Sequence, residues 1–288
     1  MNYLGCAVDD FYTILPRDKN LRKHIAYYYF HESENENFKK DIVYHPHYLS
    51  ALNVYSNVKI QWSSSGKTYL PIASNAKEVI LTVNNKTSKE VKLRGAFSKI
   101  GIVFNPLGIN HFIKAPLSTL MKSSRASNFN YFGDDFITTA DLVFHSRDFE
   151  IKGDILDTFF KGYFREFEDK RLLKAVDLIL NSSKIPRTQD IADSLGISRK
   201  TLLRLFKTHM CFTVEEFKSV VKFRKALSHY EKAIAKPRLS HVAYDNKYYD
   251  QSDFINHFKA ITGLNPKKFF ATIRDISAIG TYWTVKED

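Results

Sequence analysis

Basic side chains recur at helical spacing in the C-terminal half of the sequence. Lys200, Leu203, Arg204 and Lys207 lie at positions i, i+3, i+4 and i+7, which places them on one face of a helix. No acidic residue occurs in residues 199–209. Arg and Lys on such a face can donate hydrogen bonds to phosphate oxygens and to base edges in the major groove. The pattern predicts a helix that binds nucleic acid.

A helix-turn-helix over Thr188–His209 would position this face. Thr188 and Ser198 are N-cap residue types, and Gly196 supplies the backbone freedom of a tight turn between two helices. The buried side of the second helix follows an i, i+3, i+4 spacing through Leu202, Leu205 and Phe206. For one such motif alone, an ordinary helical hairpin with a solvated charged face is the alternative.

The same pattern recurs about 52 positions further on. Asp250 takes the cap position of Ser198, while Phe254 and Phe258 correspond to Leu202 and Phe206. A long helix, predicted over residues 214–233, would join the two units. A plain helical bundle has no reason to repeat the turn, the cap and the exposed face together, so the repeat indicates an internal duplication.

These residues resemble the DNA-binding domain of AraC/XylS-type regulators. The match runs through Ala192, Gly196, Ser198, Leu202, Arg204, Phe206, Lys207, Ala226, Asp250, Gln251, Ser252, Phe254, Phe258, Lys259, Gly263 and Pro266. The resemblance implies seven helices over residues 171–276, with two recognition helices entering successive major grooves. The chain departs from the family pattern at Lys247-Tyr248, where Gly-Phe is usual, and at Lys222 and Asn256, where arginine is frequent.

The DNA-binding residues predicted from this alignment lie on both units. They are Ser198, Arg199, Lys200, Thr201, Leu203, Arg204, Lys207, Gln251, Ser252, Ile255, Asn256 and Lys259. We expect Arg204 to pair with guanine, and Asn256 or Gln251 with adenine. Leu203 and Ile255 would either pack on thymine methyl groups or be buried against a neighbouring helix. The lysines, Ser198 and Thr201 would bind phosphate.

The charge distribution supports a polyanion as partner. The chain has a net charge of +12, and residues 171–276 alone carry 20 Lys and Arg against 10 Asp and Glu. A basic module beside a near-neutral one is typical of proteins in which one domain binds nucleic acid. An anionic membrane surface could attract the same charge, but no amphipathic helix with exposed bulky apolar residues accompanies it.

The first 115 residues are predicted to be rich in β-strands. Short β-branched and aromatic segments occur at His24–Glu32, Ser50–Tyr55, Val58–Trp62, Val79–Val83 and Val91–Gly95. Their close spacing favours a sandwich or cupin-like barrel. The following segment, FNPLGINHFIKAPLSTL, resembles part of the β-rich sensor-like domain of some AraC/XylS-type regulators.

Three histidines raise the alternative of a metal-binding, cupin-type enzyme domain fused to a DNA-binding module. His45 and His47 form an H-x-H pair, and His111 could supply a third ligand. However, no glutamate follows the pair at a cupin-like distance, and Pro46 interrupts the strand. No catalytic triad, phosphate-binding loop or paired carboxylates stand out either. We therefore expect no enzyme activity, no metal and no cofactor.

The predicted architecture is α+β with two domains. Residues 1–150 would form an effector-binding or dimerisation domain, 151–170 a linker helix, 171–276 the DNA-binding domain and 277–288 a tail. The N-terminus lacks the order of a signal peptide, no apolar run reaches membrane-spanning length, and two cysteines, Cys6 and Cys211, suit a reducing cytosol.

The predicted function is that of a cytoplasmic bacterial transcription regulator, an activator of the AraC type, acting on double-stranded promoter DNA. The resemblance implies a homodimer, with RNA polymerase and a small-molecule effector as further candidate partners. A regulator whose N-terminal domain only mediates assembly is a third alternative.

Overall fold

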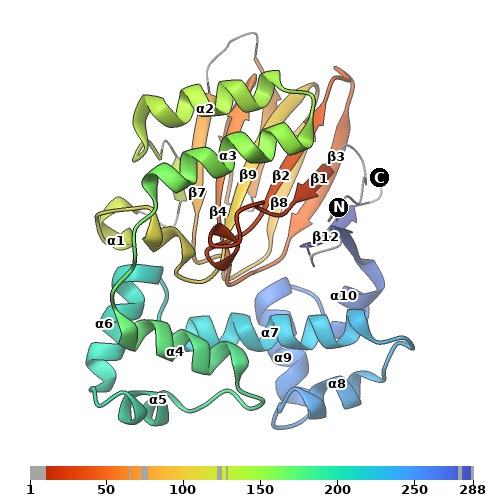
Figure 1. The fold of residues 1–288 in the computed structure, drawn as a ribbon. Coiled ribbons are helices and arrows are strands. Elements are labelled where there is room, and N and C mark those ends of the chain that lie inside the picture. Colours follow the sequence, from red (N-terminus) through yellow and green to blue (C-terminus); the bar gives the residue numbers. More distant parts are fainter. Residues whose placement is uncertain are drawn as a thin grey trace.

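A β-rich half and a helical half make up the structure, a computed structural model (Figure 1). It describes residues 11–64, 66–72, 77–121, 125–127, 129–277 and 281–286. Cys6 lies outside these residues, as do parts of the predicted tail. The predicted fold class, a β-rich N-terminal region followed by a helical region with two helix-turn-helix units, is confirmed.

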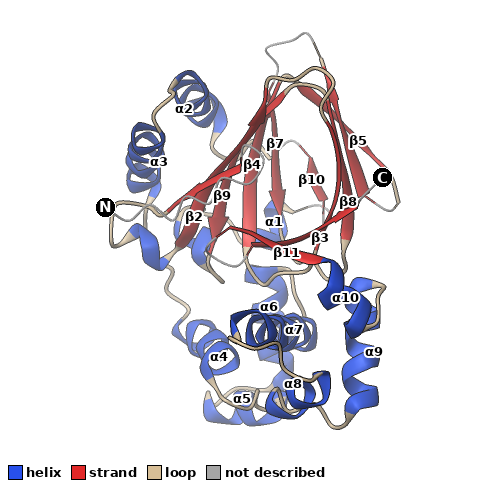
Figure 2. Cartoon of the chain, turned by 90° about the vertical axis from the view of Figure 1, so that its right-hand side faces the viewer, coloured by secondary structure: helices blue, strands red, loops and turns tan. Residues whose placement is uncertain are grey.

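Two six-stranded sheets form the β-rich half and face one another (Figure 2). The first sheet runs β1 (Phe11–Ile14), β2 (Ile25–Ser33), β9 (Phe97–Phe104), β4 (Ser50–Ser56), β7 (Lys77–Thr82) and β10 (Arg125–Ser127). The second runs β11 (Ile273–Ser277), β12 (Thr281–Lys286), β3 (Lys39–Tyr44), β8 (Lys89–Arg94), β6 (Gly66–Pro71) and β5 (Val58–Trp62). Neighbouring strands are antiparallel except β6 and β8, which are parallel.

The central strands of the first sheet are buried on both faces. In β2, Tyr27 and Tyr29 join the core between the sheets, whereas Tyr28 and Phe30 join a second core on the other face. This division follows from the alternation of side chains along a strand. It explains why the segment around His24–Glu32 is almost continuously apolar rather than alternating.

Helices α2 (Gly133–His145) and α3 (Phe149–Tyr163) cover the outer face of the first sheet (Figure 1). Helix α3 overlaps the region 151–170 that is predicted as a linker helix, but it starts two residues earlier and ends seven residues earlier. A 3₁₀ turn (Gly108–His111) and the short helix α1 (Leu117–Leu120) lead from β9 towards the helical half.

Seven helices form the helical half, as the resemblance implies. They are α4 (Lys170–Asn181), α5 (Thr188–Ser194), α6 (Arg199–Met210), α7 (Val214–Lys232), α8 (Leu239–Asp245), α9 (Gln251–Thr262) and α10 (Pro266–Thr272). Helix α7 is the predicted long connector, and an apolar cluster surrounds each of its ends. One predicted cap is wrong: Arg187, not Thr188, is the N-cap of α5, and its backbone N–H donates to the Asp190 carboxylate at 3.3 Å.

The end of the chain returns to the β-rich half. Strand β12 pairs antiparallel with β3, with Val285 opposite Ile42 and Lys286 opposite Asp41. The hairpin of β11 and β12 thereby extends the second sheet, although it follows α10 directly in sequence. Among the described residues, no helix is both long enough and apolar enough to span a membrane.

Candidate nucleic-acid interface and the cavity behind it

The first helix-turn-helix unit consists of α5 and α6, and α6 begins at the predicted N-cap, Ser198. The Ser198 side chain accepts a hydrogen bond from the Thr201 N–H at 3.1 Å at the start of α6. Gly196 adopts the left-handed conformation, with φ 63°, in the turn between the helices. The Ile197 N–H donates to the Ala192 carbonyl at 3.1 Å, which closes the turn.

The second unit, α8 and α9, repeats this arrangement with one extra residue. Asp250 caps α9 by accepting from the Asp253 N–H at 2.8 Å. The Tyr248 N–H donates to the Ala243 carbonyl at 3.0 Å, as Ile197 does to Ala192. Lys247 takes the left-handed conformation, with φ 56°, that Gly196 adopts in the first unit. A turn without glycine therefore forms, but in a conformation that disfavours an L side chain.

A half-buried histidine, His257, contacts both the turn of the second unit and helix α7. His257 lies 2.7 Å from the Tyr248 hydroxyl through Nδ1 and 2.8 Å from the Ser219 hydroxyl through Nε2. Lys222, one of the departures from the family pattern, lies 3.8 Å above the Tyr248 ring and 3.6 Å from the Asp253 carboxylate. Burial, assisted by the positive charge of Lys222, lowers the pKa of His257 to about 4.

The predicted DNA-binding residues occupy the exposed sides of α6 and α9 and their N-terminal ends. Nine are exposed: Ser198, Arg199, Lys200, Arg204, Lys207, Gln251, Ser252, Asn256 and Lys259. Thr201, Leu203 and Ile255 are partly buried. Both helices have their C-terminal ends against the β-rich half, so their N-terminal ends lie on the far side (Figures 1 and 2).

Two tyrosines beside the second unit were missed by the sequence reasoning. Tyr249, the extra residue of the turn, is 93% exposed, and Tyr244 on α8 is 76% exposed. The Tyr249 N–H donates to the Asp253 carboxylate at 3.1 Å, which fixes the backbone at the start of α9. Only the extra position in the turn, visible when the two units are aligned residue by residue, could have pointed to Tyr249.

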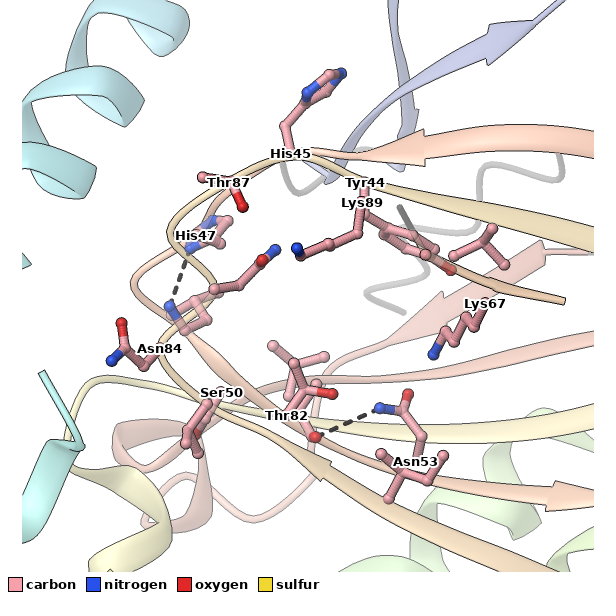
Figure 3. Close-up of a pocket in the computed structure, with 18 of the residues that line it drawn as sticks. Tyr44, His45, His47, Ser50, Asn53, Lys67, Thr82, Asn84, Thr87 and Lys89 are labelled. Atoms are coloured by element: carbon pink, nitrogen blue, oxygen red, sulfur yellow. Dashed lines mark hydrogen bonds between the residues drawn. The ribbon is translucent and has the colours of Figure 1, made fainter. Parts of the chain in front are cut away.

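A cavity of about 430 Å³ lies behind this interface, between the two sheets and next to α7 (Figure 3). Its described lining contains five cations and no Asp or Glu: Lys67, Lys86, Lys89, Lys99 and Arg224. Arg224 belongs to α7, so both halves of the chain contribute to the wall. No sequence motif marks these residues, because strands distant in the chain bring them together.

Lys99 is the most deeply buried of these cations, with 3% exposure. Its Nζ lies 4.8 Å from the ring centre of Tyr29, 5.2 Å from Tyr55 and 5.6 Å from Tyr44. Lys67 contacts the same group, donating to the Tyr55 hydroxyl at 2.9 Å. Burial, together with the charge of Lys67, lowers the pKa of Lys99 well below its ordinary value.

The three histidines weighed as metal ligands have other partners. His45 points away from the cavity (Figure 3), with Nδ1 2.8 Å from the Ser88 hydroxyl and Nε2 2.9 Å from the Thr284 hydroxyl. The Nδ1 atom of His47 accepts from the Leu49 N–H, and that of His111 from the Phe167 N–H. Within the part of the chain that the structure describes, no three His, Cys, Asp or Glu side chains are grouped to hold a metal ion.

One comparison with known proteins agrees with this description of the helical half. A family model described as a helix-turn-helix domain matches residues 191–272. No curated protein sequence matches the chain. A structure of ToxT from Vibrio cholerae aligns with a TM-score of 0.46 and 13% identity, covering 84% of this chain and 98% of that one. A structure of ToxT with a bound unsaturated fatty acid gives a TM-score of 0.42 and 12% identity, covering 90% and 93%.

The family match spans the second helix-turn-helix unit and most of the first, together with the connecting helix α7. It therefore coincides with the duplicated units, their caps and their exposed basic face. Residues 191–272 therefore form a helix-turn-helix domain, and all of the predicted DNA-binding residues lie within it.

Proposed function

We propose that the chain recognises a bipartite DNA site, with α6 in one major groove and α9 in the next. The observation that carries this proposal is the common orientation of the two helices: each is held at its C-terminal end and exposes its N-terminal end. Recognition helices of this class insert their N-terminal residues into the groove. Two successive grooves on one DNA face are one helical turn apart, about 34 Å or roughly 10 bp.

The chemistry of the exposed side chains suggests how each unit would read DNA. Arg204 would donate two hydrogen bonds to guanine O6 and N7, and Asn256 or Gln251 would pair with adenine N6 and N7. Leu203 and Ile255 keep part of their surface exposed, which suits contact with a thymine methyl group. The remaining predicted residues would bind phosphate: Ser198, Arg199, Lys200, Thr201, Lys207, Ser252 and Lys259.

Selection of bound DNA from a random pool tests this proposal directly. With the full chain at moderate salt, we expect enrichment of two short conserved DNA sequences about 10 bp apart, one for each recognition helix. These two sequences are called boxes. Enrichment of a single box would contradict a bipartite site. Absence of any enriched sequence, both with the full chain and with residues 165–288, would contradict sequence-specific binding altogether.

We infer further that the cavity binds an anionic small molecule that regulates DNA binding. The described lining contains five cations and no Asp or Glu, which favours a negative ligand, and its tyrosine rings favour an apolar body. A carboxylate beside Lys99 would restore the protonated state that burial disfavours. Because Arg224 comes from α7, such a ligand would contact both halves of the chain.

Matched pairs of acids and alcohols test the charge preference of the cavity. We expect decanoate or naphthoate to raise the melting temperature of the full chain, and decanol or naphthylmethanol to raise it much less. Lys99→Met should keep the fold, because it replaces a buried cation by an apolar chain of similar length, and should abolish the difference. Equal effects of acid and alcohol on the wild-type chain would contradict an anionic effector.

Three finer features complete the proposal. We infer that the regulator works as a homodimer in the bacterial cytoplasm, where its DNA lies, and that it activates promoters through contact with RNA polymerase. The proposed mechanism requires binding and a change of conformation, and no catalytic step. Analytical ultracentrifugation with and without DNA tests the homodimer, and transcription in a reconstituted system tests activation.

A further inference from the structure

The loop Val83–Ser88 connects the two sheets at the mouth of the cavity. It leaves β7 of the first sheet and enters β8 of the second. Five of its six residues line the cavity: Val83, Asn84, Asn85, Lys86 and Thr87. In Figure 3, Asn84 and Thr87 lie on the side of the cavity that is nearer to the helical half. The same loop therefore borders both the cavity and the DNA-binding domain.

Asn84 holds the C-terminal end of α6. Its side-chain N–H donates to the backbone carbonyl of Cys211, which ends the helix in a left-handed conformation with φ 56°. Close by, Asn110 donates to the carbonyl of His209 at 3.0 Å. The last carbonyls of a helix lack partners within the helix, so these two asparagines satisfy groups that would otherwise need water. The first recognition helix is thereby fixed from behind.

Ser88 holds the C-terminal end of α9 in a similar manner. Its backbone N–H donates to the Ile261 carbonyl at 3.0 Å, and its hydroxyl lies 3.4 Å from the same oxygen. The hydroxyl also contacts His45 Nδ1 at 2.8 Å, which ties it to the end of β3. Ile261 belongs to the last turn of the second recognition helix. Residues four apart in one loop thus contact both recognition helices.

Lys86, midway between them, contacts the connecting helix α7. Its ammonium group pairs with Glu216, whose carboxylate also accepts from the Thr213 N–H in the capping box at the start of α7. Alternate loop residues therefore contact α6, α7 and α9 in turn. Four residues of extended chain span at most about 14 Å, so the loop allows little independent movement of the two helix ends.

We propose that Asn84 and Ser88 are positioning residues that set the placement of α6 relative to α9, and hence the base-pair spacing between the two DNA boxes. This inference rests on the proposed bipartite recognition. Successive base pairs are separated by about 3.4 Å, so a displacement of one helix by that distance changes the preferred spacing by one base pair. Because the loop lines the cavity, its position also links the effector site to the spacing of the boxes.

A library in which the two selected boxes are joined by spacers of varied length tests the proposal. We expect the wild-type chain to enrich one spacing, and Asn84→Ala to enrich additional spacings one base pair longer or shorter. Ser88→Ala should have the same effect to a smaller extent, because it removes the hydroxyl contacts with Ile261 and His45 but keeps the backbone hydrogen bond to Ile261. Asn85→Ala is the matched control, because Asn85 lines the same cavity but contacts His47 through its backbone. It should keep the wild-type spacing.

Asn84→Asp serves as a second variant if Asn84→Ala fails to fold. It keeps the size of the side chain but replaces the donor to Cys211 by an acceptor, so it too should broaden the spacing. If folded variants lose affinity equally at all spacings, the loop has only a structural role and the proposal is overturned. In that result the wild-type chain still selects paired boxes, so the proposed function stands. A wild-type chain that selects no pair at any spacing overturns both.

Discussion

The two helix-turn-helix units share one backbone plan but differ in charge and in turn chemistry. The exposed side of α6 and its N-terminal end carry four cations without an acidic residue, whereas Lys259 is the only predicted DNA-binding cation on α9. The second unit also has Asp250 as the N-cap of α9 and Asp253 in the first turn of that helix, and Lys247 replaces a glycine in the turn between α8 and α9. The two units are therefore expected to contribute unequally to the affinity and the sequence specificity of DNA binding.

The difference suggests a division of labour. Contacts between cations and phosphates supply affinity that depends on salt but carries no sequence information. We infer that the first unit provides most of this affinity, while the second contributes hydrogen bonds from uncharged side chains such as Asn256 and Gln251. The loop between β7 and β8 would then matter most for the second unit, because fewer charges hold that unit on DNA.

The largest expected effect is the loss of base recognition in the first unit. Arg204→Ala should weaken binding to the selected site by about 5-fold to 150-fold, because a bidentate pair contributes roughly 1–3 kcal/mol of discrimination. Binding to a site with a mutated first box should change much less. Asn256→Ala should give the corresponding result at the second box. Competition binding with each box mutated in turn measures both, and equal losses on all sequences would contradict base recognition by Arg204.

The salt dependence of DNA binding measures how much the cations of each unit contribute to affinity. Removing all four cations of the first unit (Arg199, Lys200, Arg204 and Lys207) should reduce the slope of log K against log salt by about 0.9 for each phosphate that is no longer neutralised. Lys259→Ala in the second unit should reduce this slope by at most about 0.9, the value for one phosphate. Fluorescence anisotropy over a range of salt concentrations gives the slopes. If the second unit accounts for the larger share of the slope, the inferred division of labour is wrong.

The helical half could be predicted well because its signals are local. Apolar residues at helical spacing, the caps at Ser198 and Asp250 and the turn at Gly196 each depend on residues a few positions apart, and the structure confirms them. The error at Thr188 shifts one helix start by a single residue, since Arg187 holds the cap position through Asp190.

The missed features depend on contacts between distant segments. Strand β12 forms because β3, about 240 positions earlier, offers an open edge, as the pairing of Val285 with Ile42 shows. The cavity needs Lys67, Lys99 and Arg224, which come from two strands and a helix. No local pattern specifies such arrangements, because tertiary packing determines them.

The turns of the two units allow a matched test of backbone conformation. Lys247→Gly should stabilise the chain by about 1 kcal/mol, because a non-glycine residue in the left-handed region costs roughly 1–2 kcal/mol. Gly196→Ala should destabilise it by a similar amount, since an added Cβ there meets no atom within 4 Å and only the backbone is strained. Urea denaturation measures both. Lys247→Ala controls for loss of the lysine side chain, which lies 5.5 Å from the Tyr244 ring centre.

The smallest expected effect is a pH dependence of folding stability that arises from His257 in the second unit. His257 is neutral in the folded chain because burial, with Lys222 nearby and against the opposing charge of Asp253, lowers its pKa from 6.5 to about 4. The unfolded chain binds a proton at His257 as the pH falls through 6.5, so folding stability decreases from there down to about pH 4. Between pH 7 and 6 the loss attributable to His257 is about 0.7 kcal/mol. His257→Gln should remove this share of the pH dependence while keeping polar atoms near Tyr248 and Ser219. The melting temperature of both proteins at several pH values tests it, and identical pH profiles would show that His257 already titrates normally in the folded chain.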